Sequence, residues 1–249
     1  MSAPRRHGGR NALLLIAALF ALWQVLFWAV GDAALSSPLA TLRYTANLVT
    51  GENFRMHLFD TMRAFAIAFV LSVVIGLLVG FWLGFDRLSG DALEPMIVTV
   101  YAIPKLTLYP ILLLAFGLGL SAKVAFGVLH GTIPIILFTL GAVRNTRPIL
   151  LKTGHVLKLS RPQMVRWILF PAAIPEIFTG LRVGFSLTLI GSLLAEMFAS
   201  QRGLGYLLMN GIGLHNIDLV MSVTLLIVVF AAAVSTLLLQ IDRRLHRQG

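Results

Sequence analysis

Long apolar segments dominate this sequence and limit what it can fold into. Each of six segments is long enough to cross the hydrocarbon core of a bilayer, which takes about 20 apolar residues in a helix. They lie at about residues 12–31, 62–85, 93–117, 122–143, 172–198 and 217–239. Because a helix satisfies its own backbone hydrogen bonds inside a bilayer, the sequence predicts an all-α membrane protein with six transmembrane helices.

The composition supports a membrane protein and argues against nucleic-acid binding. Charged residues make up 12% of the chain and the mean hydropathy is +0.89, whereas soluble domains carry about 25% charged residues. The formal charge of +10 comes from cations at the ends of the apolar segments. The excess of Lys and Arg in cytoplasmic loops explains that placement, so we expect a lipid bilayer and no nucleic acid as partner.

The same cations predict the orientation. With the N-terminus inside, 14 of the 20 Lys and Arg residues lie on the inner flanks and five on the outer side. We therefore expect both termini in the cytoplasm. The expected parts are cytoplasmic tails at 1–11 and 241–249 and a transmembrane domain at 12–240. The polar segment at 32–60 is then periplasmic, with a short helix on the outer surface.

Glycines at four-residue spacing predict how the helices pack. This spacing lets helix backbones approach closely in a membrane, where no hydrophobic effect drives helix association. We therefore expect the second to fifth segments to form one compact bundle. The glycines concerned are Gly76, Gly80, Gly84, Gly127, Gly131, Gly180 and Gly184.

The third segment is the least regular. Pro104 and Pro110 interrupt the helix ladder, and Lys105 lies between them in the middle of the apolar run. An ionisable residue at membrane depth points to a function, so Lys105 is a candidate to face a translocation pathway and attract an anion. The alternative is that Lys105 reaches the interface or bonds carbonyls freed at the proline break. Glu196 is a second pathway candidate, with an ion pair at the bilayer edge as its alternative.

A cation-rich loop at about 147–171 separates the fourth and fifth segments. From Lys152 to Pro171 it has four Lys and Arg residues and no acidic residue. Leu157, Met164 and Ile168 have a spacing that fits a short amphipathic helix. We expect a helix near 158–167 to project from the cytoplasmic side and dock on another protein.

The loop resembles the coupling loop of permease subunits of ATP-binding-cassette (ABC) importers. That motif reads Glu-Ala-Ala, three residues, Gly, nine residues, then Ile-x-Leu-Pro. Its spacing falls on Lys152-Thr153-Gly154, Lys158 and Ile168-Leu169-Phe170-Pro171. Here Lys replaces both the acidic residue and the glycine, and Phe replaces Leu. The candidate coupling residues are Lys152, Gly154, Lys158, Ser160, Arg161, Arg166, Trp167 and Pro171.

A wider set of residues resembles the permeases of importers for sulfonates, taurine, nitrate and related small solutes. The likeness covers about residues 57–240. In chain order the matching residues are Ile103-Pro104-Lys105, Pro110, Phe116-Gly117, Gly119, Ser121, Lys123, Gly180, Arg182, Ala195-Glu196-Met197 and Gly203-Leu204-Gly205.

The resemblance implies a type I importer permease with a cytoplasmic coupling helix between spans four and five. It also implies the partners: a second copy of the chain, two ATPase subunits and a periplasmic solute-binding protein. ATP and Mg²⁺ are then bound by the ATPase, since this chain lacks the G-x-x-x-x-G-K-[ST] phosphate loop. Its six histidines show no metal-ligand spacing, so we expect no metal, no cofactor and no catalytic residue.

The solute is the least constrained part of the interpretation. The resemblance favours a small anion such as a sulfonate or nitrate, and a neutral or cationic vitamin precursor is the alternative. A stand-alone secondary transporter is another alternative. Such a carrier is expected to show internal repeats across its halves, and no convincing repeat is present.

Overall fold

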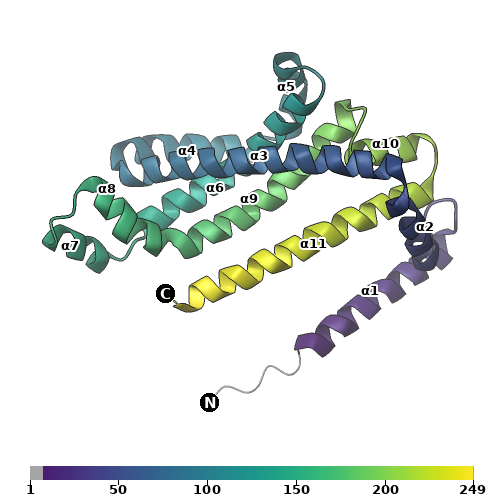
Figure 1. Ribbon diagram of the computed structural model, residues 1–249, viewed down its shortest axis with the longest axis horizontal. Helices are drawn as coiled ribbons and strands as arrows, with labels where there is room; N and C mark the ends of the chain where they lie inside the picture. Colours follow the sequence, from purple (N-terminus) through teal and green to yellow (C-terminus); the bar gives the residue numbers. More distant parts are fainter. Residues whose placement is uncertain (1–7, 249) are drawn as a thin grey trace.

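The computed structural model describes residues 8–248, and that range contains helices and no strand (Figure 1). The elements are α1 (Gly8–Val30), α2 (Pro38–Thr50), α3 (Glu52–Phe85), α4 (Arg87–Ala102), the 3₁₀ turn η1 (Lys105–Leu108), α5 (Tyr109–Phe116), α6 (Leu120–Arg144), α7 (Pro148–Val156), α8 (Arg161–Met164), the π-helical turn η2 (Val165–Leu169), α9 (Phe170–Ala199), α10 (Leu204–Gly213) and α11 (Ile217–Gln248). The all-α class expected from the sequence is confirmed.

Helices α3, α6 and α9 form the centre of the bundle, and α6 packs most extensively on the other two. The glycines of α3 make close approach to α6 possible. A Cβ added to Gly76 would lie 2.6 Å from Ile135 Cγ2, and one added to Gly80 would lie 2.6 Å from Thr139 Cβ. Gly84 lies in the same way against Val143. The backbones of α3 and α6 therefore touch along three successive turns.

The glycines of α6 and α9 make the second close contact. Gly127 faces Ser192 and Ala68, Gly131 faces Thr188, Gly180 faces Phe138, and Gly184 faces Ile135. An added Cβ at Gly184 would lie 2.6 Å from Ile135 Cγ1. All seven glycines therefore lie where two helices meet.

The third apolar segment is not one straight helix, as the range 93–117 suggested. It consists of Arg87–Ala102 and Lys105–Phe116, which are bent by 89° relative to each other. The break falls at Ile103-Pro104, where proline cannot donate a backbone hydrogen bond. Within residues 8–248, five helices are long and apolar enough to cross a membrane, and the bent pair counted as one span gives the expected six.

Helix α3 is longer than its apolar segment. It contains 34 residues and begins at Glu52, ten residues before the predicted start at 62. At 1.5 Å per residue it is about 51 Å long, more than the ~30 Å core of a bilayer. The segment predicted as periplasmic, 32–60, therefore includes the first turns of α3 as well as the short helix α2. Ser37 caps α2 by accepting a hydrogen bond from the Ala40 N–H at 3.2 Å.

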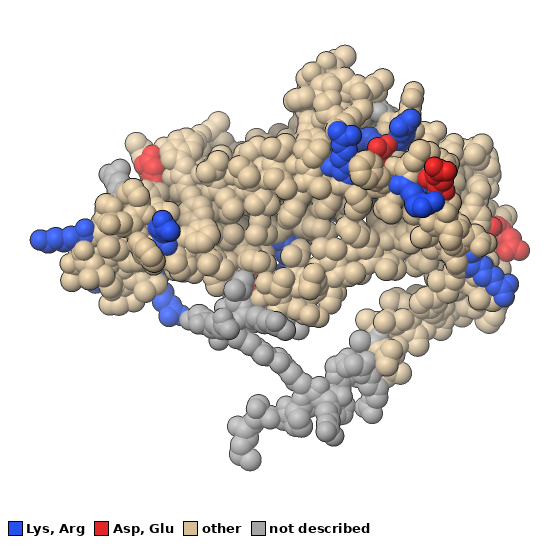
Figure 2. Space-filling model, viewed as in Figure 1, with Lys and Arg blue, Asp and Glu red and all other residues tan. Residues whose placement is uncertain are grey.

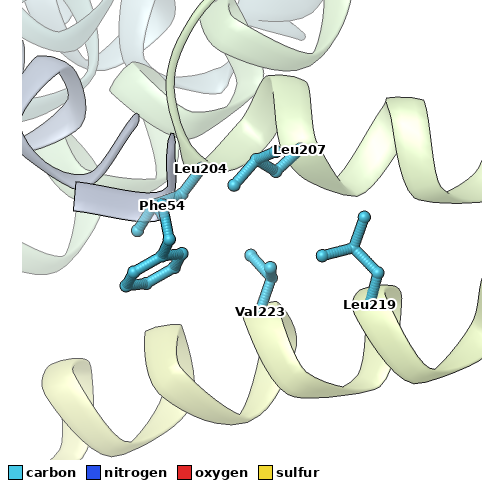
Figure 3. Close-up of a cluster of buried hydrophobic side chains, with 5 residues drawn as sticks. All are labelled: Phe54, Leu204, Leu207, Leu219 and Val223. Atoms are coloured by element: carbon cyan, nitrogen blue, oxygen red, sulfur yellow. The ribbon is translucent and has the colours of Figure 1, made fainter. Parts of the chain in front are cut away.

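A small cluster of apolar side chains closes the bundle at the end where α10 lies. Phe54 from α3, Leu204 and Leu207 from α10, and Leu219 and Val223 from α11 pack together (Figure 3). The start of α3 is thereby fixed to α10 and α11, which lie far from it in the sequence.

The surface of the molecule is that of a membrane protein. Lys, Arg, Asp and Glu gather mainly toward the two ends, with a largely uncharged surface between them (Figure 2). Helix α1 contributes an 18-residue apolar window at Leu13–Val30, none of it buried. It is tied to the loop before α2 by Trp23, whose Nε1–H donates to the Ser36 carbonyl at 3.0 Å.

Candidate functional site

The loop between α6 and α9 holds a separate short helix, α7, at Pro148–Val156. The predicted helix near 158–167 is present from Arg161 onward, but it is not a separate helix. The chain turns at Leu157–Ser160, and from Arg161 onward α8 and η2 continue without a break into α9. The apolar spacing that suggested one helix therefore combined Leu157, in the turn, with Met164 and Ile168, on the extension of α9.

Gly154 lets α7 pack against that extension. An added Cβ would lie 2.5 Å from Met164 Sδ and 2.7 Å from Ile168 Cδ1. Val143, Met164 and Leu169 form a buried cluster at the same place. The loop is thus attached both to the end of α6 and to the start of α9.

Lys158 ends α7 in a left-handed conformation, with φ of +49°. Its N–H donates to the His155 carbonyl at 3.0 Å, and the Leu159 N–H donates to the Gly154 carbonyl at 3.1 Å. This pair of bonds is the Schellman motif, whose left-handed position is usually glycine. The family's coupling motif has glycine at this position, so the structure supplies a physical reason for that glycine.

The predicted coupling residues mostly lie on the outside of the loop. Lys152, Lys158, Ser160, Arg166, Trp167 and Pro171 are exposed, Gly154 is buried, and the side chain of Arg161 lies outside those described. The Ser160 N–H donates a hydrogen bond to Gln163 Oε1 of α8 at 2.8 Å. The Arg166 guanidinium lies 5.5 Å from the centre of the Trp167 ring.

Sequence reasoning missed the apolar side chains of this surface. Ile149 is 65% exposed, Val156 80% and Leu157 64%. Together with the cations they give the loop an exposed face of mixed apolar and basic character. The sequence shows only that the loop contains these apolar residues, and their exposure, which marks a candidate interaction surface, is visible only in the structure.

Glu196, near the opposite end of α9, is 1% exposed and fully bonded. Its carboxylate lies 3.3 Å from Lys123 Nζ on α6 and accepts hydrogen bonds from Thr61 Oγ1 on α3 at 2.7 Å and from the Gly205 N–H at 3.0 Å. Thr61 Oγ1 in turn accepts from the Leu204 N–H at 2.8 Å. We call these residues the Glu196 network.

The Glu196 network ties three helices to the loop between α9 and α10. Lys123 Nζ also donates to the Arg202 carbonyl at 2.6 Å, and the Gly203 N–H donates to His57 Nδ1 at 3.0 Å. Neither Thr61 nor His57 was predicted, and only the Gly203-Leu204-Gly205 sequence hinted at a tight loop here. Protein encloses Glu196 in this conformation, so its place in a pathway stays a prediction.

Lys105 lies at the break of the third span. Its Nζ donates to the Tyr101 carbonyl at 3.0 Å and lies 4.7 Å from the centre of the Tyr101 ring. The sequence analysis gave, as the alternative to a pathway role, that Lys105 reaches the interface or bonds a carbonyl at the proline break, and the structure shows such a carbonyl bond. Pro104 and Pro110, on either side of η1, are exposed. The role of these three residues in a pathway stays a prediction.

A comparison with known protein families identifies the family of this chain. Residues 72–248 match the model of the binding-protein-dependent transport system inner membrane component. The chain belongs to this family. It is a permease subunit of an ABC importer, embedded in the membrane by several spans. A subunit of such a system is not a stand-alone carrier, so the secondary-transporter alternative is excluded.

Individual relatives agree with the family. The permease is 27% identical over 209 residues to the putative aliphatic sulfonates transport permease SsuC of Bacillus subtilis, covering 83% of this chain and 75% of the relative. It is 29% identical over 200 residues to the nitrate import permease NrtB of Synechocystis sp., covering 77% and 72%. It is 32% identical over 134 residues to the riboflavin permease RibX of Chloroflexus aurantiacus, covering 54% and 50%.

A solved structure confirms the fold. The methionine ABC transporter MetNI in inward-facing conformations matches with a TM-score of 0.67, covering 78% of this chain and 99% of that one at 19% identity. The permease therefore has the type I importer fold expected from the sequence.

Proposed function

We propose that this permease is driven by a separate ATPase subunit that docks on α7 and the turn after it. The observation that carries the proposal is the exposed mixed surface of Ile149, Val156 and Leu157 beside the cations of the loop. In the proposed assembly two ATPase subunits bind ATP and Mg²⁺, and this chain holds no cofactor and performs no catalysis.

The position of α7 supports a role in force transmission. It follows α6 directly and packs on the extension of α9, and α6 and α9 are the most extensively packed pair in the bundle. Movement of α7 therefore shifts the two central helices together. ATP binding shifts the balance between outward-open and inward-open states only through its different affinity for them, which is alternating access.

We propose a homodimer with the pathway between the copies. The broken span supports this, because α4 and α5 leave large apolar side chains uncovered: Met96 is 62% exposed, Ile111 62% and Leu114 89%. In this arrangement the break with Pro104, Lys105 and Pro110 faces the pathway. A periplasmic binding protein delivers the solute to the end where α10 lies.

Arg166 and Trp167 are exposed on η2, which contacts α7, and we include them in the proposed coupling surface. The double variant Arg166→Glu/Trp167→Ala tests that surface. We expect ATP hydrolysis to continue in the reconstituted complex while solute uptake is lost, because the docking face no longer transmits movement. Purification of the variant as an intact dimer controls for folding. Uptake at the wild-type rate would contradict this assignment.

The proposed orientation places both termini in the cytoplasm of the bacterial inner membrane. Since the chain has no cysteine, single cysteines introduced at Thr45 and Ser160 report their own side without interference. We expect a membrane-impermeant thiol reagent to reach the first from outside and the second from inside. Labelling of both from one side would refute the six-span topology.

We propose a small anion, such as a sulfonate or nitrate, as the solute. The names of the relatives SsuC and NrtB support it, as does a cavity of about 630 Å³ near the Glu196 network lined by Arg63, Lys123, Arg202 and Asp60. The likeness to RibX supports a vitamin precursor as the second candidate. Titration of the cognate binding protein with methanesulfonate, nitrate and riboflavin distinguishes them, and binding of riboflavin alone would overturn the anion proposal.

A further inference from the structure

Arg144, the last residue of α6, bridges two carboxylates on α4. Its Nη2 lies 2.9 Å from Asp91 Oδ1, and its Nη1 lies 2.7 Å from Glu94 Oε2. The two acids are three residues apart and so lie on one face of α4. Nη1 donates a hydrogen bond to Glu94, whereas Nη2 lies at ion-pair distance from Asp91 without making a hydrogen bond. The hydrogen bond to Glu94 therefore gives the bridge its direction.

Gly90 shapes α4 to receive this guanidinium. A Cβ at Gly90 would collide with Arg144 Nη2 and with the Leu83 carbonyl. Beside it, Leu93 and Ile97 of α4 pack on the buried cluster of Leu83, Ile136 and Leu140. The end of α6 and the first two turns of α4 are therefore held together by an ion bridge and by apolar packing.

Helix α7 lies across a cavity from the start of α4. A cavity of about 710 Å³ has Asp86, Arg87, Asp91 and Arg144 on its lining together with Leu151 and His155 of α7. This space separates α7 from the start of α4. Arg144 lies on the boundary, four residues before α7 begins at Pro148.

We propose that Arg144 is a positioning residue that transmits the movement of α7 to the broken span formed by α4, η1 and α5. The inference rests on the proposed function, in which an ATPase moves α7. When α7 moves, the end of α6 moves with it because they are joined by Asn145–Arg147. The bridge to Asp91 and Glu94 then moves α4, and α4 moves the proline break at its far end.

The first test separates coupling from folding. Arg144→Gln removes the bridge, and Arg87→Gln is the matched control: Arg87 is exposed, lines the same cavity and makes no ion pair with the described residues. Both variants are reconstituted with the ATPase and the binding protein, and ATP hydrolysis and solute uptake are measured. For Arg144→Gln we expect solute moved per ATP to fall about fivefold or more, the lower end for coupling between sites, with hydrolysis retained.

The control Arg87→Gln is expected to keep the wild-type ratio. A second variant, Arg144→Glu/Glu94→Arg, restores the attraction with exchanged partners, and we expect it to recover part of the ratio. An unchanged ratio in Arg144→Gln, or an equal loss of hydrolysis and uptake, would overturn the inference. If the wild-type complex shows no ATP-dependent uptake, the proposed function itself fails, and the inference falls with it.

The second test follows the movement directly. Spin labels on cysteines introduced at Leu88 on α4 or Leu150 on α7, which are 82% and 37% exposed, report distances between the two copies with and without nucleotide. In the otherwise wild-type protein we expect both distances to change. In Arg144→Gln the distance at 150 still changes and the distance at 88 does not. A change at 88 equal to the wild type would overturn the inference.

Discussion

Replacing Lys158 by glycine tests whether the end of α7 is strained. Lys158 has φ of +49°, a left-handed conformation that costs a residue with a Cβ about 1–2 kcal/mol. Glycine removes that cost but loses about 0.5–1 kcal/mol more conformational entropy on folding. The difference predicts that Lys158→Gly stabilises the end of α7 by about 0.5–1 kcal/mol.

Hydrogen exchange measures this local stability, because amides at helix ends exchange through local opening. The Leu159 N–H, which donates to the Gly154 carbonyl, is the reporter. Since 1.4 kcal/mol is a factor of ten, its exchange should slow roughly two- to fivefold. Unchanged or faster exchange would show that the left-handed turn is not strained, and the reasoning from φ would be refuted.

The chain contains its own control for this experiment. His215 has φ of +53° and ends α10 in the same motif, with the Asn216 N–H donating to the Gly211 carbonyl at 2.8 Å. His215→Gly should slow exchange at Asn216 and leave Leu159 unchanged. Lys158→Gly should do the reverse, so a global change in stability is distinguished from a local one.

Three further substitutions test other parts of the structure. Glu196→Gln leaves Lys123 buried without its charge partner, which costs about 3–5 kcal/mol of folding free energy. The Tm in detergent should therefore fall by roughly 6 °C or more, and an unchanged Tm would contradict the ion-pair geometry. Gly80→Ala should lower the free energy of unfolding by about 1–3 kcal/mol through overpacking. Its control is Gly213→Ala, which has open space around the Cβ position and should leave Tm unchanged. Equal effects of the two substitutions would refute the packing argument. Lys105→Ala should weaken uptake of an anion more than that of a neutral solute, and equal losses would indicate a role confined to the helix end.

Features set by local sequence were predictable. The apolar segments gave the spans, because only a helix or a barrel satisfies the backbone in lipid. The four-residue spacing of Gly76, Gly80 and Gly84 indicated close approach, since that spacing lies on one face of a helix. The partner helix was not predictable, because spacing within one segment carries no information on which neighbour it meets.

Features that depend on tertiary contacts were missed. The Glu196 network joins residues 61, 123, 196 and 205, and no local pattern connects positions so far apart. Helix α7 was not predicted as a separate helix, because the apolar period continues through the turn at Lys158, where a lysine has the left-handed conformation that is usual for glycine. The bend at Pro104 was expected as an irregularity, but its size of 89° depends on the packing of α4 and α5 around it.

The continuity of α9 with the loop before it has a mechanical consequence. The stretch Pro162–Phe198 is one helix of 37 residues, about 55 Å long at 1.5 Å per residue. Its far end is anchored by the contacts of Glu196. In the proposed mechanism, a force on the near end therefore tilts the helix about that anchor. A tilt of about 5° around that anchor displaces the near end by about 5 Å, close to one helical turn. The anchored end then acts as the pivot point of the movement.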